Sequence, residues 1–322
     1  MSTLPLPPHD TAAAPGAAID FEAQFSRDAP MYHGDVGGNT PWSIQQWLER
    51  TAWRTLKDTR YRRPPVETGL LPELFTDPLL RQVYLIDLAV FLGGEKTSMD
   101  AVAGLLRCAP DESSQVYLGT QVVDECRHYE VFCRRMADLG ISPEKRDTLV
   151  QRYTTPAVRN FYDLILEQVD KGDFIAGSLA QNIVMEGMAY PLYRYEIKYW
   201  SRIDPSLAQI IRGAFADEAH HVGFGEAVVG RHLARLDAPQ KARLRQLLAQ
   251  FSGLMTEAFE QVITHYIGLY QECANQYMGV MGDVEISPGH RIAQLSEEDQ
   301  VRLLLEEIRQ EHAARAARIG IA

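Results

Sequence analysis

The sequence contains few cysteines, and none of them stand in a C-x-x-C pair. Only 4 occur in 322 residues: Cys108, Cys126, Cys133 and Cys273. Cys126 and Cys133 are expected on one helix, about 10 Å apart along its axis, which excludes a disulfide between them. This usage favours four reduced thiols and predicts a cytoplasmic protein.

Positive charge is also scarce. Lys and Arg together number 32 against 43 Asp and Glu, which gives a formal net charge of −11. A surface that binds nucleic acid is not expected, because phosphate binding needs clustered Lys and Arg. The same deficit leaves no basic face for an anionic membrane. No apolar run reaches the ~18 residues of a membrane span, and no basic segment followed by an apolar block suggests a secretory signal.

No segment alternates apolar and polar residues as a half-buried strand does, so the predicted fold class is all-α. Apolar residues recur at helical spacing over most of the chain. We expect a bundle of long helices. Its parts are a flexible N-terminal arm at 1–40, a helical domain at 41–280, and a loop with a C-terminal amphipathic helix at 281–322. Long helices are expected at 41–61, 78–107, 111–139, 174–200, 205–236, 239–278 and 296–319.

Two short stretches share one pattern, a carboxylate followed three residues later by an imidazole. They are Glu125-x-x-His128 and Glu218-x-x-His221. On an α-helix, positions i and i+3 lie on one face, so both side chains can reach one point beside the helix. Two such helices facing each other can hold two metal ions.

One isolated glutamate in an apolar run precedes each of these pairs. Glu95 stands 125 − 95 = 30 residues before the first pair, and Glu186 stands 218 − 186 = 32 residues before the second. A step of this length is one helix out and one helix back. Because carboxylates are rarely buried unless paired or metal-bound, both are expected to complete a dimetal site in a bundle core. Four carboxylates and two imidazoles suit two Fe ions, or one Mn and one Fe.

Neighbouring polar residues are candidates for orienting the ligands. Asp124 and Asp217 each directly precede a ligand glutamate and are expected to accept the distal ring N–H of a ligand histidine. Arg127 is expected to pair with one of these aspartates. His220 takes the place in the second half that Arg127 takes in the first, and on a regular helix it points away from His221.

At these residues the chain resembles the ferritin-like superfamily of dimetal-carboxylate oxygen activators. The superfamily includes ribonucleotide reductase small subunits, bacterial multicomponent monooxygenase hydroxylases and ligand-binding oxidases related to the reductase subunit. The run 124–128 looks like the monooxygenase motif, whereas the runs 128–132 and 182–188 look closer to the ligand-binding oxidases. The resemblance covers roughly residues 78–280. It implies a ferritin-like four-helix bundle with additional flanking helices, in which the domain at 41–280 holds the dimetal site. It also implies that dioxygen is activated at the metals through a peroxo or high-valent oxo species.

The chain differs from particular families of the superfamily in three features, and these differences limit the activities that the resemblance implies. Reductase subunits commonly keep a radical tyrosine where this chain has Phe132. The ligand-binding oxidases carry a Val–Tyr ether cross-link at positions that are Ser98 and Gln181 here, so that cross-link cannot form. Amine N-oxygenases of the superfamily add a histidine where this chain has Ala214.

The sequence therefore predicts a non-haem dimetal oxidoreductase, an oxidase or oxygenase that acts on a small organic substrate in an apolar pocket. The expected partners are dioxygen, the substrate, an electron-donor protein and a second copy in a homodimer. The alternatives are an amine N-oxygenase, a reductase-type small subunit without a tyrosyl radical, and a metal-storing or scaffold subunit. Residues about one turn from the ligands are expected to line the pocket: Phe91, Met99, Gln121, Phe132, Tyr190 and Phe224.

Overall fold

The computed structural model describes Trp47 and residues 71–321. The arm at 1–40 and most of the helix expected at 41–61 lie outside the described residues. The helices and strands, in chain order, are α4 (Glu73–Thr76), α5 (Pro78–Cys108), α6 (Glu112–Asp138), α7 (Pro143–Tyr153), α8 (Pro156–Asp170), α9 (Phe174–Ser178), the π-helix η3 (Leu179–Glu186), α10 (Gly187–Ile203), α11 (Pro205–Ala234), α12 (Ala238–Gln276), α13 (Met278–Met281), β1 (Glu285–Ser287), β2 (His290–Arg291), the 3₁₀-helix η4 (Ile292–Gln294) and α14 (Glu297–Ile319).

Four helices begin where a capping side chain stands directly before a proline. The side chains of Asp77, Ser142, Thr155 and Asp204 accept hydrogen bonds from backbone N–H groups of the first turn of α5, α7, α8 and α11. The proline that follows needs no hydrogen bond at this position and already has the helical φ. The sequence thus sets the start of each helix locally.

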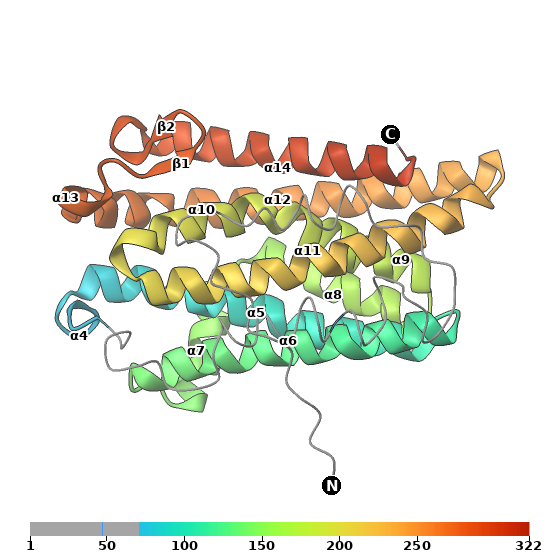
Figure 1. Cartoon of the computed structure of the whole chain (residues 1–322), viewed down its shortest axis with the longest axis horizontal. Coiled ribbons are helices and arrows are strands. Elements are labelled where there is room, and N and C mark those ends of the chain that lie inside the picture. The colour runs from blue at the N-terminus through green and yellow to red at the C-terminus, as the bar shows by residue number, and fades with distance from the viewer. Residues whose placement is uncertain (1–46, 48–70, 322) are drawn as a thin grey trace, which may run out of the picture.

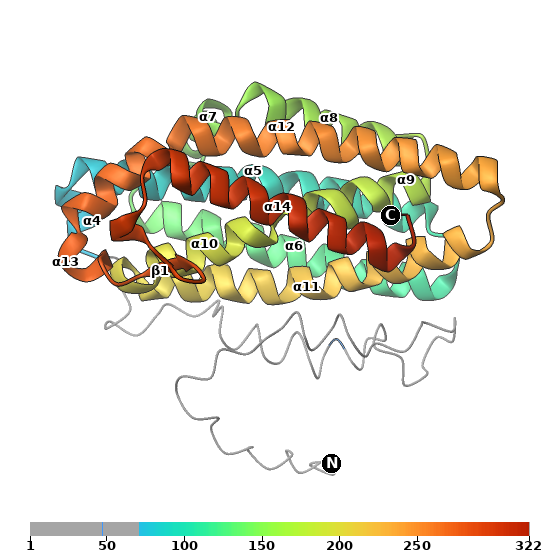
Figure 2. The ribbon, with the colours of Figure 1, turned by 90° about the horizontal axis from the view of Figure 1, so that it is seen from above.

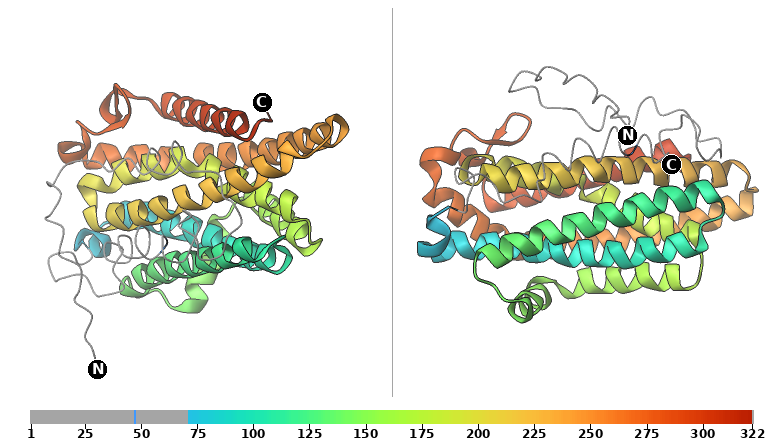
Figure 3. Two further views of the ribbon diagram at one scale, coloured as in Figure 1. Left: turned by 45° about the vertical axis from the view of Figure 1, so that its right-hand side comes forward. Right: turned by 60° about the horizontal axis from the view of Figure 1, so that its bottom comes forward.

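The long helices run side by side along the longest axis of the molecule (Figure 1). α5 packs against α6, α10 packs against α11, and α11 also contacts η3. α12 and α14 lie against each other over one side of this set, with α8 packed on α12 (Figure 2). The further views in Figure 3 show the same layered bundle, with α7 and α8 next to α5. The predicted all-α fold class is confirmed.

The helix expected at 174–200 differs from a regular helix. It is divided into α9, η3 and α10, and Glu186 is the last residue of the π-helical stretch. Pro191 lies inside α10 and has no N–H to donate to the carbonyl of Gly187. That carbonyl instead accepts a hydrogen bond from Nε of Arg315 on α14, at 3.2 Å. The C-terminal helix α14 therefore supplies a hydrogen bond to the backbone carbonyl directly after the candidate ligand Glu186.

The loop expected between the helices at 239–278 and 296–319 contains a small antiparallel hairpin of β1 and β2. Gly289 supports its turn with a φ of +76°, a conformation that glycine adopts at little cost. Among the described residues, no helix combines the length and the apolar character needed to span a membrane.

Candidate dimetal site

The structure brings six side chains from four helical segments to one place in the bundle. Glu95 comes from α5, Glu186 from η3, and one Glu–His pair each from α6 and α11. All six are buried, with at most 4% of any of them exposed. They form two overlapping groups whose donor atoms lie within 4.8 Å of one another: Glu95, Glu125, His128 and Glu218 in the first, and Glu125, Glu186, Glu218 and His221 in the second.

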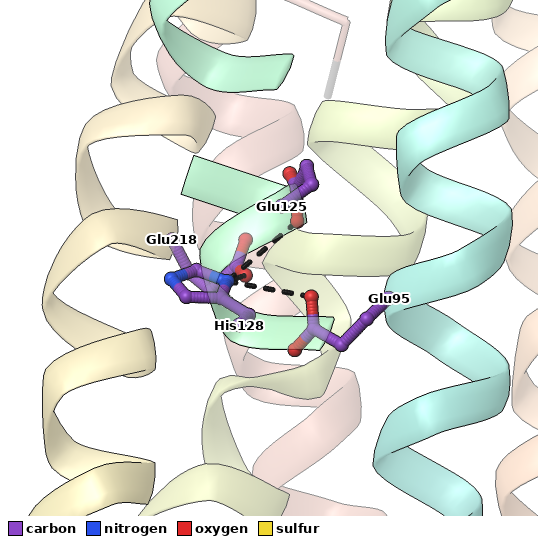
Figure 4. A group of neighbouring side chains, drawn as sticks. All are labelled: Glu95, Glu125, His128 and Glu218. Carbon is purple, nitrogen blue, oxygen red and sulfur yellow. Dashed lines mark ion pairs between the residues drawn. The ribbon is translucent and has the colours of Figure 1, made fainter. Parts of the chain in front are cut away.

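In the first group, the His128 ring lies among three carboxylates (Figure 4). Its Nδ1 is 3.3 Å from Oε2 of Glu95, 3.5 Å from Oε1 of Glu218 and 3.7 Å from Oε2 of Glu125. Carboxylate oxygens and an imidazole nitrogen thus converge on a common point, which is the arrangement that a single cation requires.

The second group repeats this geometry around His221. Its Nδ1 is 3.2 Å from Oε2 of Glu218, 3.3 Å from Oε1 of Glu125 and 3.7 Å from Oε1 of Glu186. Glu125 and Glu218 therefore each turn one oxygen toward His128 and the other toward His221. This is how two carboxylates that bridge a pair of ions are disposed, while Glu95 and Glu186 each face one group only.

The two halves are joined by crossed histidine–aspartate contacts. Nε2 of His128 lies 2.9 Å from Oδ2 of Asp217, and Nε2 of His221 lies 3.4 Å from Oδ2 of Asp124. Each aspartate thus faces the histidine of the opposite motif. A carboxylate acceptor at Nε2 favours a proton on that nitrogen, which would leave Nδ1, on the side of the glutamates, available to a metal ion.

Arg127 lies between the two aspartates and pairs with both, whereas a single pairing was expected. Its Nη2 hydrogen-bonds Oδ2 of Asp217 and lies 3.4 Å from Oδ1 of Asp124. The guanidinium balances the charge of both aspartates in this buried layer. Trp47, which no sequence motif singled out, donates from Nε1 to Oδ2 of Asp124 at 2.8 Å.

His220 lies away from both groups. Its ring meets Tyr117 edge-on at 5.1 Å between centroids, and its Nδ1 is 3.4 Å from the Tyr117 hydroxyl. The helix turns the His220 side chain toward Tyr117 of α6.

Three side-chain amides hold the carboxylate of Glu186. Gln121 and Gln181 donate to its Oε1 at 2.9 and 3.0 Å, and Asn182 donates to its Oε2 at 3.0 Å. Neutral donors orient a carboxylate without cancelling the charge that a metal ion needs. Gln181 also donates to Oγ of Ser98 at 2.9 Å. A hydrogen bond thus joins α5 to η3 through Ser98 and Gln181. These are the two positions at which the sequence comparison above placed the ether cross-link of the ligand-binding oxidases.

The protonation of the site reflects its crowded negative charge. Burial lowers the pKa of His128 and of His221, but the neighbouring carboxylates outweigh it and raise both pKa values well above the ordinary value. Burial raises the pKa of Glu125 and Glu218, and burial together with the charge of Glu218 raises that of Glu186. Without cations, protons therefore reside among these groups.

The residues fit a pair of divalent cations. Both carboxylate oxygens of Glu125 and Nδ1 of His128 are buried with no hydrogen-bond partner in the described part of the chain. Buried polar atoms without partners are rare and call for an ion or a water. Four ligand carboxylates would balance the charge of two divalent ions, and imidazole and carboxylate donors suit iron and manganese.

A cavity of about 170 Å³ opens beside the cluster and is lined mostly by apolar side chains of α5, α8, α10 and α12. Glu95, Glu186 and Glu218 form part of its wall. Of the six residues expected to line a pocket, only Phe91 lines this cavity. The six residues were expected there because each lies about one helical turn from a ligand, which leaves out the direction in which each side chain points. The cavity lies on the side of the bundle that faces α12.

The other expected pocket residues pack elsewhere. Phe132 stacks on Phe91 at 4.8 Å, and Phe224 stacks on Tyr117 at 3.9 Å. The hydroxyl of Tyr190 donates to the Glu218 carbonyl at 3.1 Å, and Gln121 binds Glu186 as described. Met99 is partly buried on α5 away from the cavity lining.

No protein-family model and no curated protein sequence matches the chain. Its structure is similar to those of R2-like ligand-binding oxidase mutants with an aerobically reconstituted Mn/Fe cofactor. One has a TM-score of 0.63 at 15% identity over 89% of this chain and 100% of that chain. Another has a TM-score of 0.61 at 16% identity over 90% and 100%. At such identity the similarity shows a shared fold.

Proposed function

We propose that this chain, whose fold is that of the ferritin-like dimetal-carboxylate superfamily, is an oxidoreductase that activates dioxygen at two metal ions. The ions are Fe/Fe or Mn/Fe, and the substrate is a small organic molecule in the adjoining cavity. One observation carries the proposal. Two Glu-x-x-His pairs and two further glutamates meet in a buried site that opens onto an apolar cavity.

The roles of the ligand side chains follow from which group each one faces. Glu125 and Glu218 would hold both ions, Glu95 and His128 one ion, and Glu186 and His221 the other. When bound, the metals supply the electrons and the coordination positions for dioxygen reduction. Asp124 and Asp217 would keep the proton on Nε2 of each imidazole, so that Nδ1 stays available as a donor.

The cavity would exclude water and hold an apolar substrate against the three glutamates of its wall. Its lining is largely apolar, with Met255 and Phe259 on the α12 side. A dry cavity protects a reactive site from side reactions and strengthens its electrostatics. At the position of a radical tyrosine, Phe132 offers no phenol and stacks on Phe91. This favours an oxidase or oxygenase over a reductase-type small subunit.

The test is to load metal-free protein with Fe(II), or with Mn(II) and Fe(II), and then to admit air. We expect about two ions per chain, oxygen uptake and a transient optical band. Glu125→Gln removes one shared carboxylate and should lower both the metal count and the oxygen uptake. The exposed variant Glu285→Gln is the control. No oxygen uptake by protein that holds two ions would reject oxygen activation, and many ions per chain would indicate metal storage.

A further inference from the structure

The cavity beside the dimetal site carries a second polar feature, a pair of carboxylic acids at its other end. Asp87 and Glu196 both line the cavity, on α5 and α10. Asp87 stands 95 − 87 = 8 residues before Glu95, which is about 12 Å along a helix. Glu196 stands 196 − 186 = 10 residues after Glu186, about 15 Å along its helical segment. The cavity thus runs from the metal ligands to this acid pair.

Among the residues that the structure describes, no cation balances the acid pair. Asp87 is 4% exposed, Glu196 is partly buried, and the two carboxyl groups hydrogen-bond each other. Within the same part of the chain, their other donor is Nε1 of Trp200, which binds Asp87 and lies 3.2 Å from Oε2 of Glu196. Among the described residues, no Lys or Arg forms an ion pair with either acid. Burying the charge of a carboxylate is costly without a cation beside it, so a cationic ligand in the cavity would stabilise the pair.

Two tyrosines along the same cavity also make no side-chain hydrogen bond among the described residues. Tyr193 and Tyr270 line the cavity, are 8% and 6% exposed, and donate no hydrogen bond within the part of the chain that the structure describes. Tyr270 belongs to the acid-pair end, since its ring lies 6.5 Å from that of Tyr195 and 5.2 Å from that of Tyr199. The hydroxyl of a buried tyrosine usually has a hydrogen-bond partner, which points to a ligand with polar groups in the cavity.

We propose that the cavity binds an elongated, mostly apolar molecule with a protonated amine at the end that lies between Asp87, Glu196 and Tyr270. The inference deepens the proposed function by naming the substrate class. An ammonium group has three N–H donors, which suits these three acceptors. The rings of Tyr195 and Tyr270 add the aromatic surface that favours cations. The apolar body then extends toward the glutamates at the metal end.

The protonation state of the pair agrees with this assignment. Burial raises the pKa of Asp87 to about 7, and burial and the charge of Asp87 raise the pKa of Glu196 well above its ordinary value. Near neutral pH the pair therefore holds one proton and part of one negative charge. A bound ammonium would favour the ionised form and remove the cost of burying that charge.

The test uses the full-length, metal-free protein, so that it does not depend on metal loading or oxygen chemistry. Octylamine, 1-octanol and octanoate share one apolar chain and differ only at the end group. Binding is measured by calorimetry and by the shift in melting temperature. We expect octylamine to bind about tenfold to a hundredfold more tightly than 1-octanol, the range for hydrogen bonds to charged groups, and octanoate to bind most weakly.

Three variants localise the amine. Asp87→Asn and Glu196→Gln keep the shape of each side chain and should each weaken octylamine about tenfold or more while leaving 1-octanol unchanged. Tyr270→Phe should weaken octylamine less, because it removes one neutral acceptor. Glu285→Gln, an exposed acid on β1, should have no effect. Equal binding of amine and alcohol, tighter binding of octanoate, no binding of octylamine, or an amine affinity that neither acid variant changes would each overturn the proposal.

Discussion

Replacing Gly187 by alanine is expected to destabilise the protein through one side chain, Arg315 of α14. A Cβ at position 187 would lie 2.7 Å from Cδ and 2.8 Å from Nε of Arg315. The arginine cannot move away freely, because it is 3% exposed and its guanidinium pairs with Glu226 at 3.1 Å and with Glu311 at 2.7 Å. It also lies over the Tyr190 ring, 4.0 Å from the centroid.

The magnitude follows from three contributions. Overpacking a buried site costs about 1–3 kcal/mol. Displacing Arg315 also weakens its hydrogen bond to the Gly187 carbonyl, and a bond from a charged donor contributes about 1.5–3 kcal/mol. Alanine is preferred over glycine within a helix by about 1 kcal/mol, which offsets part of the loss. We expect Gly187→Ala to lower the free energy of unfolding by about 1.5–5 kcal/mol.

The assay is a double-mutant cycle followed by urea unfolding of the metal-free protein. In an Arg315→Ala background the clash is gone, so Gly187→Ala should become neutral or stabilise by up to about 1 kcal/mol. Gly253→Ala is the matched control, since a Cβ at that position of α12 meets nothing within 4 Å. If the two substitutions are additive, or if Gly187→Ala is as benign as Gly253→Ala, the proposed contact is wrong.

Three further predictions concern the site and the cavity. Gln181→Leu removes one donor to Glu186 and should weaken binding of one of the two metal ions about tenfold in a titration, whereas Ser98→Ala should not; equal losses in both would argue against the amide clamp. Asp217→Asn should reduce metal affinity about tenfold to a hundredfold in a chelator competition, and an unchanged affinity would contradict its orienting role. Because the folded-state pKa of Asp87 is raised from 3.8 to about 7, the stability linked to its neutral form is complete below pH 3.8 and is lost as the pH rises through about 7. Between pH 5 and pH 8, the free energy of unfolding should therefore fall less in Asp87→Asn than in the wild-type protein, by up to about 1.4 kcal/mol per pH unit in urea unfolding. If the free energies of unfolding of the two proteins change with pH in parallel, this prediction is wrong.

Much of the fold and of the cluster was accessible from the sequence because both depend on local rules. The helical spacing of apolar residues predicted the long helices, and the i, i+3 spacing placed Glu125 with His128 on one helix face. The buried glutamates were recognisable because a carboxylate in an apolar run needs a partner. The structure brings these residues together in two groups, as the spacing of the motifs predicted.

What the sequence did not reveal depends on the direction of side chains between helices. The spacing rules could not tell that Asp124 would face His221 instead of His128, because that choice depends on how α6 and α11 pack. The cavity was misplaced for the same reason, since only the position of α12 determines which side stays hollow. The contribution of Arg315 was hidden because a sequence gap of 128 residues separates it from the carbonyl that it binds.

The crossed contacts between the imidazoles and the aspartates make α6 and α11 mechanically dependent on each other. Each helix supplies the histidine of one half of the site and the aspartate that orients the histidine of the other half. Any sliding of one helix against the other would misalign both halves at once. Capture of a first ion would thus fix the axial register that a second ion requires, and the pair should fill cooperatively.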